Sequence, residues 1–207
     1  MSTAAVAIRP GEVLADLLPV VGASPARAKS RAWGRVRDIA LVAGGAALTA
    51  LSAQLSVPVP GSPVPVTGQT FAALLVGTAL GARRGLLSLG LYAAVGAAGA
   101  PVFQGGTSGW GGASFGYVIG MLIAAGMVGA LARRGGDRSV PRMAGTMVLG
   151  SAVIYAVGVP WLMAATGMSL SAALAAGVVP FLIGDALKAA LAMGALPTAW
   201  KLVGRKG

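Results

Sequence analysis

The feature that most limits what this chain can fold into is a succession of long apolar runs separated by short loops. We distinguish six runs, at about 38–57, 66–82, 85–102, 114–132, 143–165 and 172–200. A helix needs about 20 apolar residues to cross a bilayer, and it satisfies its own backbone hydrogen bonds there. Only 10% of the residues are charged, against about 25% in soluble domains. The sequence therefore predicts an all-α integral membrane protein, a bundle of six transmembrane helices.

The distribution of Lys and Arg predicts how these helices are oriented. All sixteen basic residues except Lys188 lie before residue 38, at 83–84, within 133–142 or after residue 200. The alternate loops, 58–65, 103–113 and 166–171, contain no charged residue. Because cytoplasmic loops are enriched in Lys and Arg, we expect a multi-pass protein of the cell membrane with both termini cytoplasmic. The net charge of +11 then reflects topology and not a nucleic-acid surface.

The first 37 residues differ in composition from the rest of the chain. They contain six basic residues and three prolines, and no run of spanning length. We interpret 1–37 as a poorly ordered basic leader in the cytoplasm and 38–207 as the membrane domain. Residues 13–21 can form one or two amphipathic turns on the membrane surface, limited by the proline at position 19.

One carboxylate lies well inside an apolar run. Asp185 is that residue, and Lys188 follows three positions later, so both side chains share a helix face. An ionised group in hydrocarbon is costly and normally faces a bundle interior or a cavity. We therefore expect Asp185 and Lys188 to line a ligand pocket. The alternative is a mutually neutralising pair that only holds two helices in register.

Composition and motifs exclude several classes of function. The chain has no Cys and no His, which removes thiolate chemistry and the usual zinc, copper and haem ligands. A phosphate-binding GxxxxGK[ST] loop is also absent. A Ser–Lys dyad using Lys188 stays open, although no Ser lies near it in sequence. We expect no enzyme, no metal and no cofactor, and either facilitated binding or a partner that supplies ATP.

Two of the uncharged loops have the composition of binding loops. The first, at 57–70, alternates Pro and Val, which favours an extended segment that can lie across a bundle mouth. The second, at 101–117, mixes glycine with aromatic rings and small hydroxyls, so backbone and flat apolar walls can approach a ligand closely. A flexible loop with interfacial aromatic anchors is the alternative. The side chains that we assign to a binding site in these loops are Thr67, Gln69, Phe103, Gln104, Thr107, Trp110 and Tyr117.

The first run offers a surface for another helix. Ala43 with Ala47, and Ala46 with Ala50, form two pairs of small residues spaced four apart. Such pairs let helix backbones approach closely in a membrane. The signal is weak by itself, since the chain is rich in Ala and Gly throughout.

Several motifs together resemble the BioY family, the biotin-specific substrate-binding components of energy-coupling-factor (ECF) transporters. They are PVPVTGQT at 63–70, GARRGL at 81–86, Tyr92 with 96–103, the Gly-rich loop 105–112, GYVIG at 116–120 and PFLIGDALK at 180–188. The resemblance runs from about residue 40 to the C-terminus. It implies a six-helix S-component that captures biotin from outside and works with a membrane coupling subunit and two cytoplasmic ATPase subunits.

The resemblance also implies roles for individual residues. Asp185 and Lys188 would contact the ureido ring of biotin, and Tyr117 with the preceding loop would form the other wall. The stretch from Ala43 to Ala50 would meet the coupling subunit. Family members often have Asn in the Gly-rich loop, where this sequence offers Gln104, Thr107 and Ser108.

Biotin chemistry fits these residues on independent grounds. A ureido group presents two N–H donors and one carbonyl acceptor, which complement an anion beside a cation. Phe103, Trp110 and Tyr117 could enclose the apolar part of the molecule, with the valerate carboxylate near the mouth. A stand-alone secondary carrier for a small vitamin-like solute, or a membrane scaffold, remains the alternative function.

Overall fold

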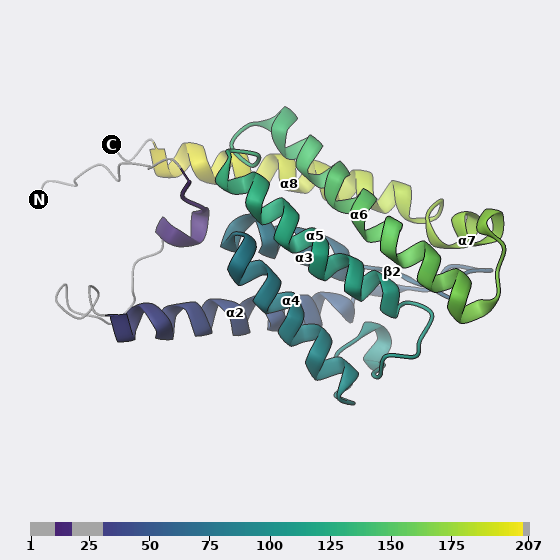
Figure 1. Cartoon of the computed structure of the whole chain (residues 1–207). Coiled ribbons are helices and arrows are strands. Elements are labelled where there is room, and N and C mark those ends of the chain that lie inside the picture. The colour runs from purple at the N-terminus through teal and green to yellow at the C-terminus, as the bar shows by residue number, and fades with distance from the viewer. Residues whose placement is uncertain (1–10, 18–30, 205–207) are drawn as a thin grey trace, which may run out of the picture.

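The computed structural model describes residues 11–17 and 31–204 of the 207-residue chain (Figure 1). Helices dominate this part of the chain, with one short pair of strands. The elements are η1 (Leu14–Leu17), α2 (Arg31–Ala53), β1 (Ser56–Val57), β2 (Val66–Thr67), α3 (Gln69–Leu80), α4 (Ala82–Ala97), η2 (Gln104–Gly106), α5 (Phe115–Arg133), α6 (Val140–Thr166), α7 (Leu170–Gly177) and α8 (Phe181–Gly204).

Four helices of the described part are long and apolar enough to cross a membrane. They lie at Ala32–Ala53, Phe115–Arg133, Val140–Thr166 and Phe181–Val203, that is, in α2, α5, α6 and α8. The apolar helix α3 has 12 residues and α4 has 16, or about 18 and 24 Å at 1.5 Å per residue. The expectation of an all-α protein that crosses the membrane several times is confirmed.

The sixth apolar run forms two helices. It is interrupted at residues 178–180, so α7 and α8 replace one continuous helix. Pro180 lies in the interruption, and proline has no N–H to continue the helical hydrogen bonds. The other five runs each contain one helix.

Helix α5 is the centre of the bundle. In its spanning stretch 56% of the residues are buried, against 22% in those of α2 and α8. It packs against α3, α4 and α6, as Figure 1 shows. Small residues permit this packing: a Cβ added at Gly77 of α3 would lie 2.5 Å from the carbonyl oxygen of Ala125, and one at Gly120 would lie 2.8 Å from that of Ile154. These helices are therefore in backbone contact.

The uncharged end of the bundle is closed by the first outer loop. β1 and β2 pair antiparallel, with Ser56 opposite Thr67 and Val57 opposite Val66. Between them, the Ser62 hydroxyl lies 2.8 Å from both the Val64 and the Ala176 carbonyl oxygens. Between the strands the chain turns at residues 60–61, where the Ser62 N–H donates to the Val59 carbonyl oxygen at 3.0 Å. The loop is therefore extended only in part, and it contacts α7 through Ser62.

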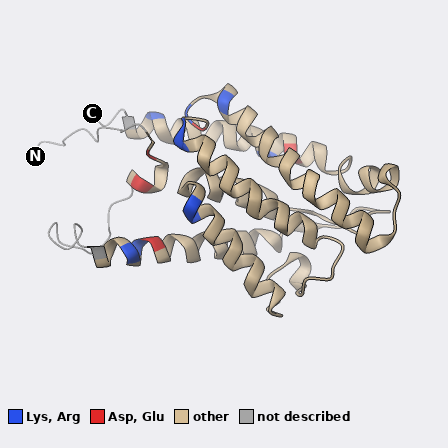
Figure 2. Cartoon of the chain, viewed as in Figure 1, with Lys and Arg blue, Asp and Glu red and all other residues tan. Residues whose placement is uncertain are grey.

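The basic residues gather at the opposite end of the bundle (Figure 2). This is the end at which α2 and α4 begin and α5 ends. Here Asp137 is fully buried and accepts a hydrogen bond of 2.8 Å from the indole N–H of Trp200. The Arg138 guanidinium lies 4.5 Å from the centre of the Trp200 ring. Burial raises the pKa of Asp137 above its ordinary value, since the contacts with Trp200, its own backbone and Arg138 oppose this only in part.

Residues Gly11–Leu17, which we call the leader segment, pack against this charged end. Val13 and Ala15 are buried and contact Ala132 of α5, with Leu41 and Leu80 alongside. We expected a poorly ordered leader over 1–37. Residues 1–10 and 18–30 lie outside the described part, residues 11–17 are packed, and the boundary at 37 falls inside α2.

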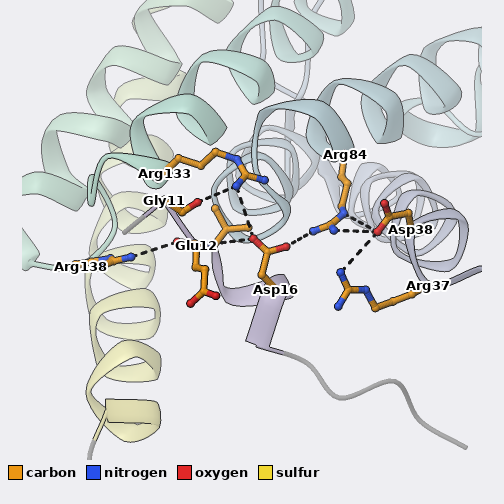
Figure 3. A network of polar contacts seen from close by, with 9 residues as sticks. Gly11, Glu12, Asp16, Arg37, Asp38, Arg84, Arg133 and Arg138 are labelled. Carbon is orange, nitrogen blue, oxygen red and sulfur yellow. Dashed lines mark hydrogen bonds and ion pairs between the residues drawn. The ribbon is translucent and has the colours of Figure 1, made fainter. Parts of the chain in front are cut away.

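Ion pairs fix the leader segment to the helices (Figure 3). An Asp16 carboxylate oxygen lies 2.7 Å from Arg84, which also lies 2.9 Å from Asp38. Arg133 donates to the carbonyl oxygen of Gly11 at 2.8 Å. Burial alone would raise the pKa of Asp16, but the hydrogen bonds from Arg84 and the Val13 N–H, with the charges of Arg84 and Arg133, outweigh it. The pKa of Asp16 is therefore below 3.8, its ordinary value.

Candidate ligand-binding site

A pocket lies at the uncharged end, between α3, α5, α6 and α8 and beneath the two outer loops. Its cavity volume is only about 20 Å³. A single water needs about 10–15 Å³ on that measure, so the pocket is contracted. Its walls are formed by Val64, Pro65, Thr67, Gln69, Thr70, Gln104, Ser114, Tyr117, Ser151, Ile154, Tyr155, Phe181 and Asp185.

The pair of charges in α8 lies at the pocket and not toward lipid. Asp185 lines the wall, and its carboxylate lies 3.4 Å from the Lys188 ammonium. The two side chains are 17% and 14% exposed, whereas Ile183 on the outer face of α8 is 77% exposed. The face of α8 that carries the charges is therefore turned into the bundle.

Each of the two charged groups also bonds to a different helix. The Tyr155 hydroxyl of α6 donates to Asp185, and the Lys188 ammonium donates to the Thr70 hydroxyl of α3 at 2.7 Å. Lys188 lines a small adjoining space with Thr70 and Asp185, and not the main pocket. The arrangement combines both sequence interpretations, because the charges pair with each other and one of them also faces a cavity.

Aromatic side chains form one wall of the pocket. The Tyr117 and Phe181 rings stack, with centroids 6.3 Å apart and planes 28° apart. Tyr155 meets Tyr117 edge to face at 6.5 Å. The Tyr117 hydroxyl donates to the carbonyl oxygen of Gly177 at 2.9 Å. A flat apolar wall therefore stands beside the Asp185 carboxylate, with its phenol groups satisfied by protein partners.

Polar side chains complete the wall beneath the outer loops. Gln69 is buried and accepts a hydrogen bond of 2.7 Å from the Tyr92 hydroxyl. Thr67 is buried at the end of β2. The Gln104 amide nitrogen donates to the Ser114 hydroxyl, while the buried Gln104 Oε1 has no hydrogen-bond partner among the described residues. Gln104 therefore lines the pocket on the side of η2, and its amide oxygen is a buried acceptor without a partner among the described residues.

Three residues that we assigned to the site lie elsewhere. Trp110 is 68% exposed and Thr107 is exposed, and neither lines the pocket. Phe103 is buried against Tyr92 and Phe115, at centroid distances of 5.3 and 6.0 Å, behind the pocket wall. The positions of Trp110 and Thr107 fit the alternative interpretation of this loop as an exposed segment with an interfacial aromatic.

The pocket also contains residues that sequence reasoning missed. Tyr155, Ser151 and Ile154 come from α6, for which we made no site assignment. The signal was present in Tyr155, because a phenol in the middle of an apolar run needs a hydrogen-bond partner. Thr70 and Phe181 lay within the motifs quoted above, and Ser114 within the loop at 101–117, without a role of their own.

The two alanine pairs of α2 lie on different faces. Ala43 and Ala47 are exposed. Ala46 is 8% exposed and belongs to the core, and Ala50 packs against that core. The expected surface for a partner helix is therefore corrected to Ala43 and Ala47, because the spacing of two overlapping pairs could not show which pair faces outward.

Comparison with known proteins shows the family to which this chain belongs. The sequence profile of the BioY family matches residues 24–205. The chain belongs to the BioY family. Among BioY relatives, the "Probable biotin transporter BioY" of Pyrococcus horikoshii is 38% identical over 162 residues, which is 77% of this chain and 93% of that protein. The "Biotin transporter BioY" of Thermotoga maritima is 33% identical over 149 residues, 70% of this chain and 85% of that protein.

A solved structure agrees with this assignment. It is the crystal structure of "the S-component for biotin from an ECF-type ABC transporter". The match has a TM-score of 0.72 and 25% sequence identity, and it covers 81% of this chain and 93% of the other. The sequence match to the BioY family and the structural match to a biotin S-component therefore agree.

Proposed function

We propose that this BioY protein is the substrate-binding S-component of an ECF-type transporter and that it captures biotin at the uncharged face of the cell membrane. Its relatives are biotin transporters by name, and the matching crystal structure is that of a biotin S-component, which supports biotin as the solute. In this proposal the six apolar runs cross the membrane, both termini are cytoplasmic, and residues 38–207 are the membrane domain. The concentration of basic residues at one end supports that orientation.

The observation that carries the proposal is the Asp185 carboxylate on the wall of an otherwise uncharged pocket, 3.4 Å from Lys188. A carboxylate accepts N–H groups, and charge-assisted hydrogen bonds are about twice as strong as neutral ones. One N–H group of the ureido ring would bind Asp185, and Lys188 would donate to the ureido carbonyl. The second acceptor is the unpartnered Oε1 of Gln104.

The remaining walls suit the apolar part of biotin. The stacked Tyr117 and Phe181 rings provide a flat surface for the thiophane ring. Thr67 and Gln69 border the pocket where the first outer loop meets α3. Phe103 acts on the site only through the packing of the wall, and Trp110 and Thr107 are left without a binding role.

Binding requires the pocket to open. The cavity volume of about 20 Å³ is far below the roughly 300–1,000 Å³ of ordinary ligand pockets. The first outer loop contacts α7 through the Ser62 hydroxyl and the Ala176 carbonyl oxygen. We propose that this loop moves outward on binding, since it covers the pocket and belongs to no helix.

Titration of the detergent-purified chain with labelled biotin tests the site. Asp185→Asn and Lys188→Ala should each weaken binding by about 1–3 kcal/mol, roughly 5- to 150-fold in Kd, because each leaves a ureido group without its charged partner. Asp38→Asn and Lys201→Ala are matched controls at the charged end and should bind as the parent does. If both pocket variants bind biotin like the parent, the pocket assignment is wrong.

Uptake assays test the partners. We propose that a membrane coupling subunit contacts Ala43 and Ala47 on α2, and that two cytoplasmic ATPase subunits drive transport. Ala47→Trp should then reduce uptake without changing the Kd for biotin, because the indole blocks close helix approach. Ala152→Trp, at an exposed alanine of α6, is the control. Uptake that persists in cells lacking coupling and ATPase subunits would instead indicate a stand-alone carrier.

A further inference from the structure

The wall of the pocket contains one charged residue, and it is an anion. Of the thirteen lining residues, Asp185 alone is charged. The loops above the pocket add no further charge. Residues 54–68, 98–114 and 167–180 are all described and contain no Asp, Glu, Lys or Arg. Figure 2 shows the same asymmetry, with the basic residues gathered at the far end of the bundle. A ligand that enters from this side meets neutral groups until it reaches α8.

The nearest cation is already engaged. Lys188 lies seven residues into α8 from Phe181, about 10 Å along the helix axis. Its ammonium donates to Thr70 at 2.7 Å and pairs with Asp185 at 3.4 Å, outside the main pocket. If Lys188 turned to a ligand carboxylate, Asp185 would lose its only cationic partner among the described residues. Unpaired charge at that depth is strongly disfavoured.

A carboxylate drawn into this pocket would therefore be desolvated beside another carboxylate, without a cation of its own. Burial of an unpaired ion costs far more than a few hydrogen bonds return. The valerate of biotin avoids that cost when it stays in water above the loops, where no described side chain carries a positive charge.

We infer that the site recognises the ring system of biotin and is indifferent to the charge of its tail. This inference rests on the function proposed above and extends its substrate class to biotin amides and esters, including biotin joined through its carboxyl to an amine such as lysine. The ring binds at Asp185, while the acyl substituent lies at the neutral mouth.

Competition with labelled biotin on the purified full chain tests this inference. Biotin amide and ε-biotinyl-lysine should displace the label with Kd values within about threefold of that of biotin. A ring-opened diamine analogue, which lacks the ureido carbonyl, should lose at least tenfold. The Kd for biotin should also change less than twofold between low and high salt, because no ion pair to the tail is screened. A tenfold loss for the amide overturns the inference.

A charge placed at the mouth provides a second test. Pro65 lines the pocket, and Pro63 on the same loop is exposed outside it. Pro65→Arg should make the site prefer biotin over its amide severalfold, whereas Pro63→Arg should leave the ratio unchanged. Absence of any biotin binding by the parent chain would refute the proposed function, while binding of biotin without its amide would refute this inference alone.

Discussion

Among the described residues, Tyr155 is the only one with a neutral side chain that hydrogen-bonds to the Asp185 carboxylate. The other two tyrosines are satisfied in the same way, Tyr92 by Gln69 and Tyr117 by the Gly177 carbonyl oxygen. A buried phenol without a partner costs about 1–3 kcal/mol. Each tyrosine therefore fixes a contact between two elements, and Tyr155 fixes the orientation of Asp185.

Removing the Tyr155 hydroxyl should loosen that orientation. We expect Tyr155→Phe to weaken biotin binding by about 0.5–1.5 kcal/mol, roughly 2- to 12-fold in Kd, because the ring is kept and one hydrogen bond is lost. Titration of the purified variant measures the change. Tighter binding by the variant would show instead that the phenol competes with the ligand for Asp185.

Thr146→Val serves as the matched control for Tyr155→Phe. The Thr146 hydroxyl donates to the carbonyl oxygens of Gly136 and Arg142 at 3.1 and 2.9 Å, at the charged end. Its loss should lower the unfolding temperature and leave the Kd for biotin unchanged.

The sequence indicated some residues of the candidate site and not others, for physical reasons. Asp185 was recognisable because a carboxylate in an apolar run must face the protein interior. Composition could not show that Tyr117 lines the pocket while Trp110 and Phe103 do not, because the direction of a loop side chain depends on the fold of the loop. Tyr155 was missed because its partner lies 30 residues away on another helix.

At the level of elements, glycine decides how closely helices and loops approach. Gly96 of α4 faces the Phe103 ring, and an added Cβ would lie 2.2 Å from it. Gly96→Ala should therefore destabilise the chain by about 1–3 kcal/mol, because the second outer loop must shift. Thermal unfolding in detergent measures this loss.

Gly90 provides a control on the same helix. A Cβ there would meet Leu122 at 3.7 Å, an ordinary contact. Gly90→Ala should be neutral, or stabilising by up to about 1 kcal/mol through the lower backbone freedom of alanine. Phe103→Leu combined with Gly96→Ala should recover part of the loss. Equal effects of the two single substitutions would contradict this account of the packing.

Asp16 gives the leader segment a pH dependence. Its pKa is below 3.8 in the folded chain, so the contacts with Arg84 and Arg133 stabilise the fold above about pH 4 and are lost as the pH falls through the folded pKa. The unfolding temperature of the parent should fall more steeply between about pH 5 and pH 3 than that of Asp16→Asn. Parallel curves would show that Asp16 adds no stability.

Helix positions were more predictable than the connections between them. Each of the six apolar runs contains helix, and Pro180 lies where the sixth is interrupted. The pairing of β1 with β2 was not predictable, because two strands of two residues have no periodicity that identifies them. The packing of the leader segment was also missed, since it depends on charges on three distant helices.

For the whole molecule, the separation of charge predicts which end faces outward. The chain has no cysteine, so single substitutions give unambiguous labels. Thr107→Cys and Arg134→Cys replace exposed residues at opposite ends. On intact cells a membrane-impermeant maleimide should label Thr107→Cys and spare Arg134→Cys until the membrane is permeabilised. The reverse pattern would invert the topology.

The leader segment lies before residue 24, where the match to the BioY family begins. A recombinant protein trimmed to the family boundary would keep Arg84 and Arg133 but lose Asp16, and it would bare the apolar patch around Ala132 that Val13 and Ala15 cover. Such a product should melt earlier and aggregate more readily than the full-length protein, although every residue of the ligand pocket is still present.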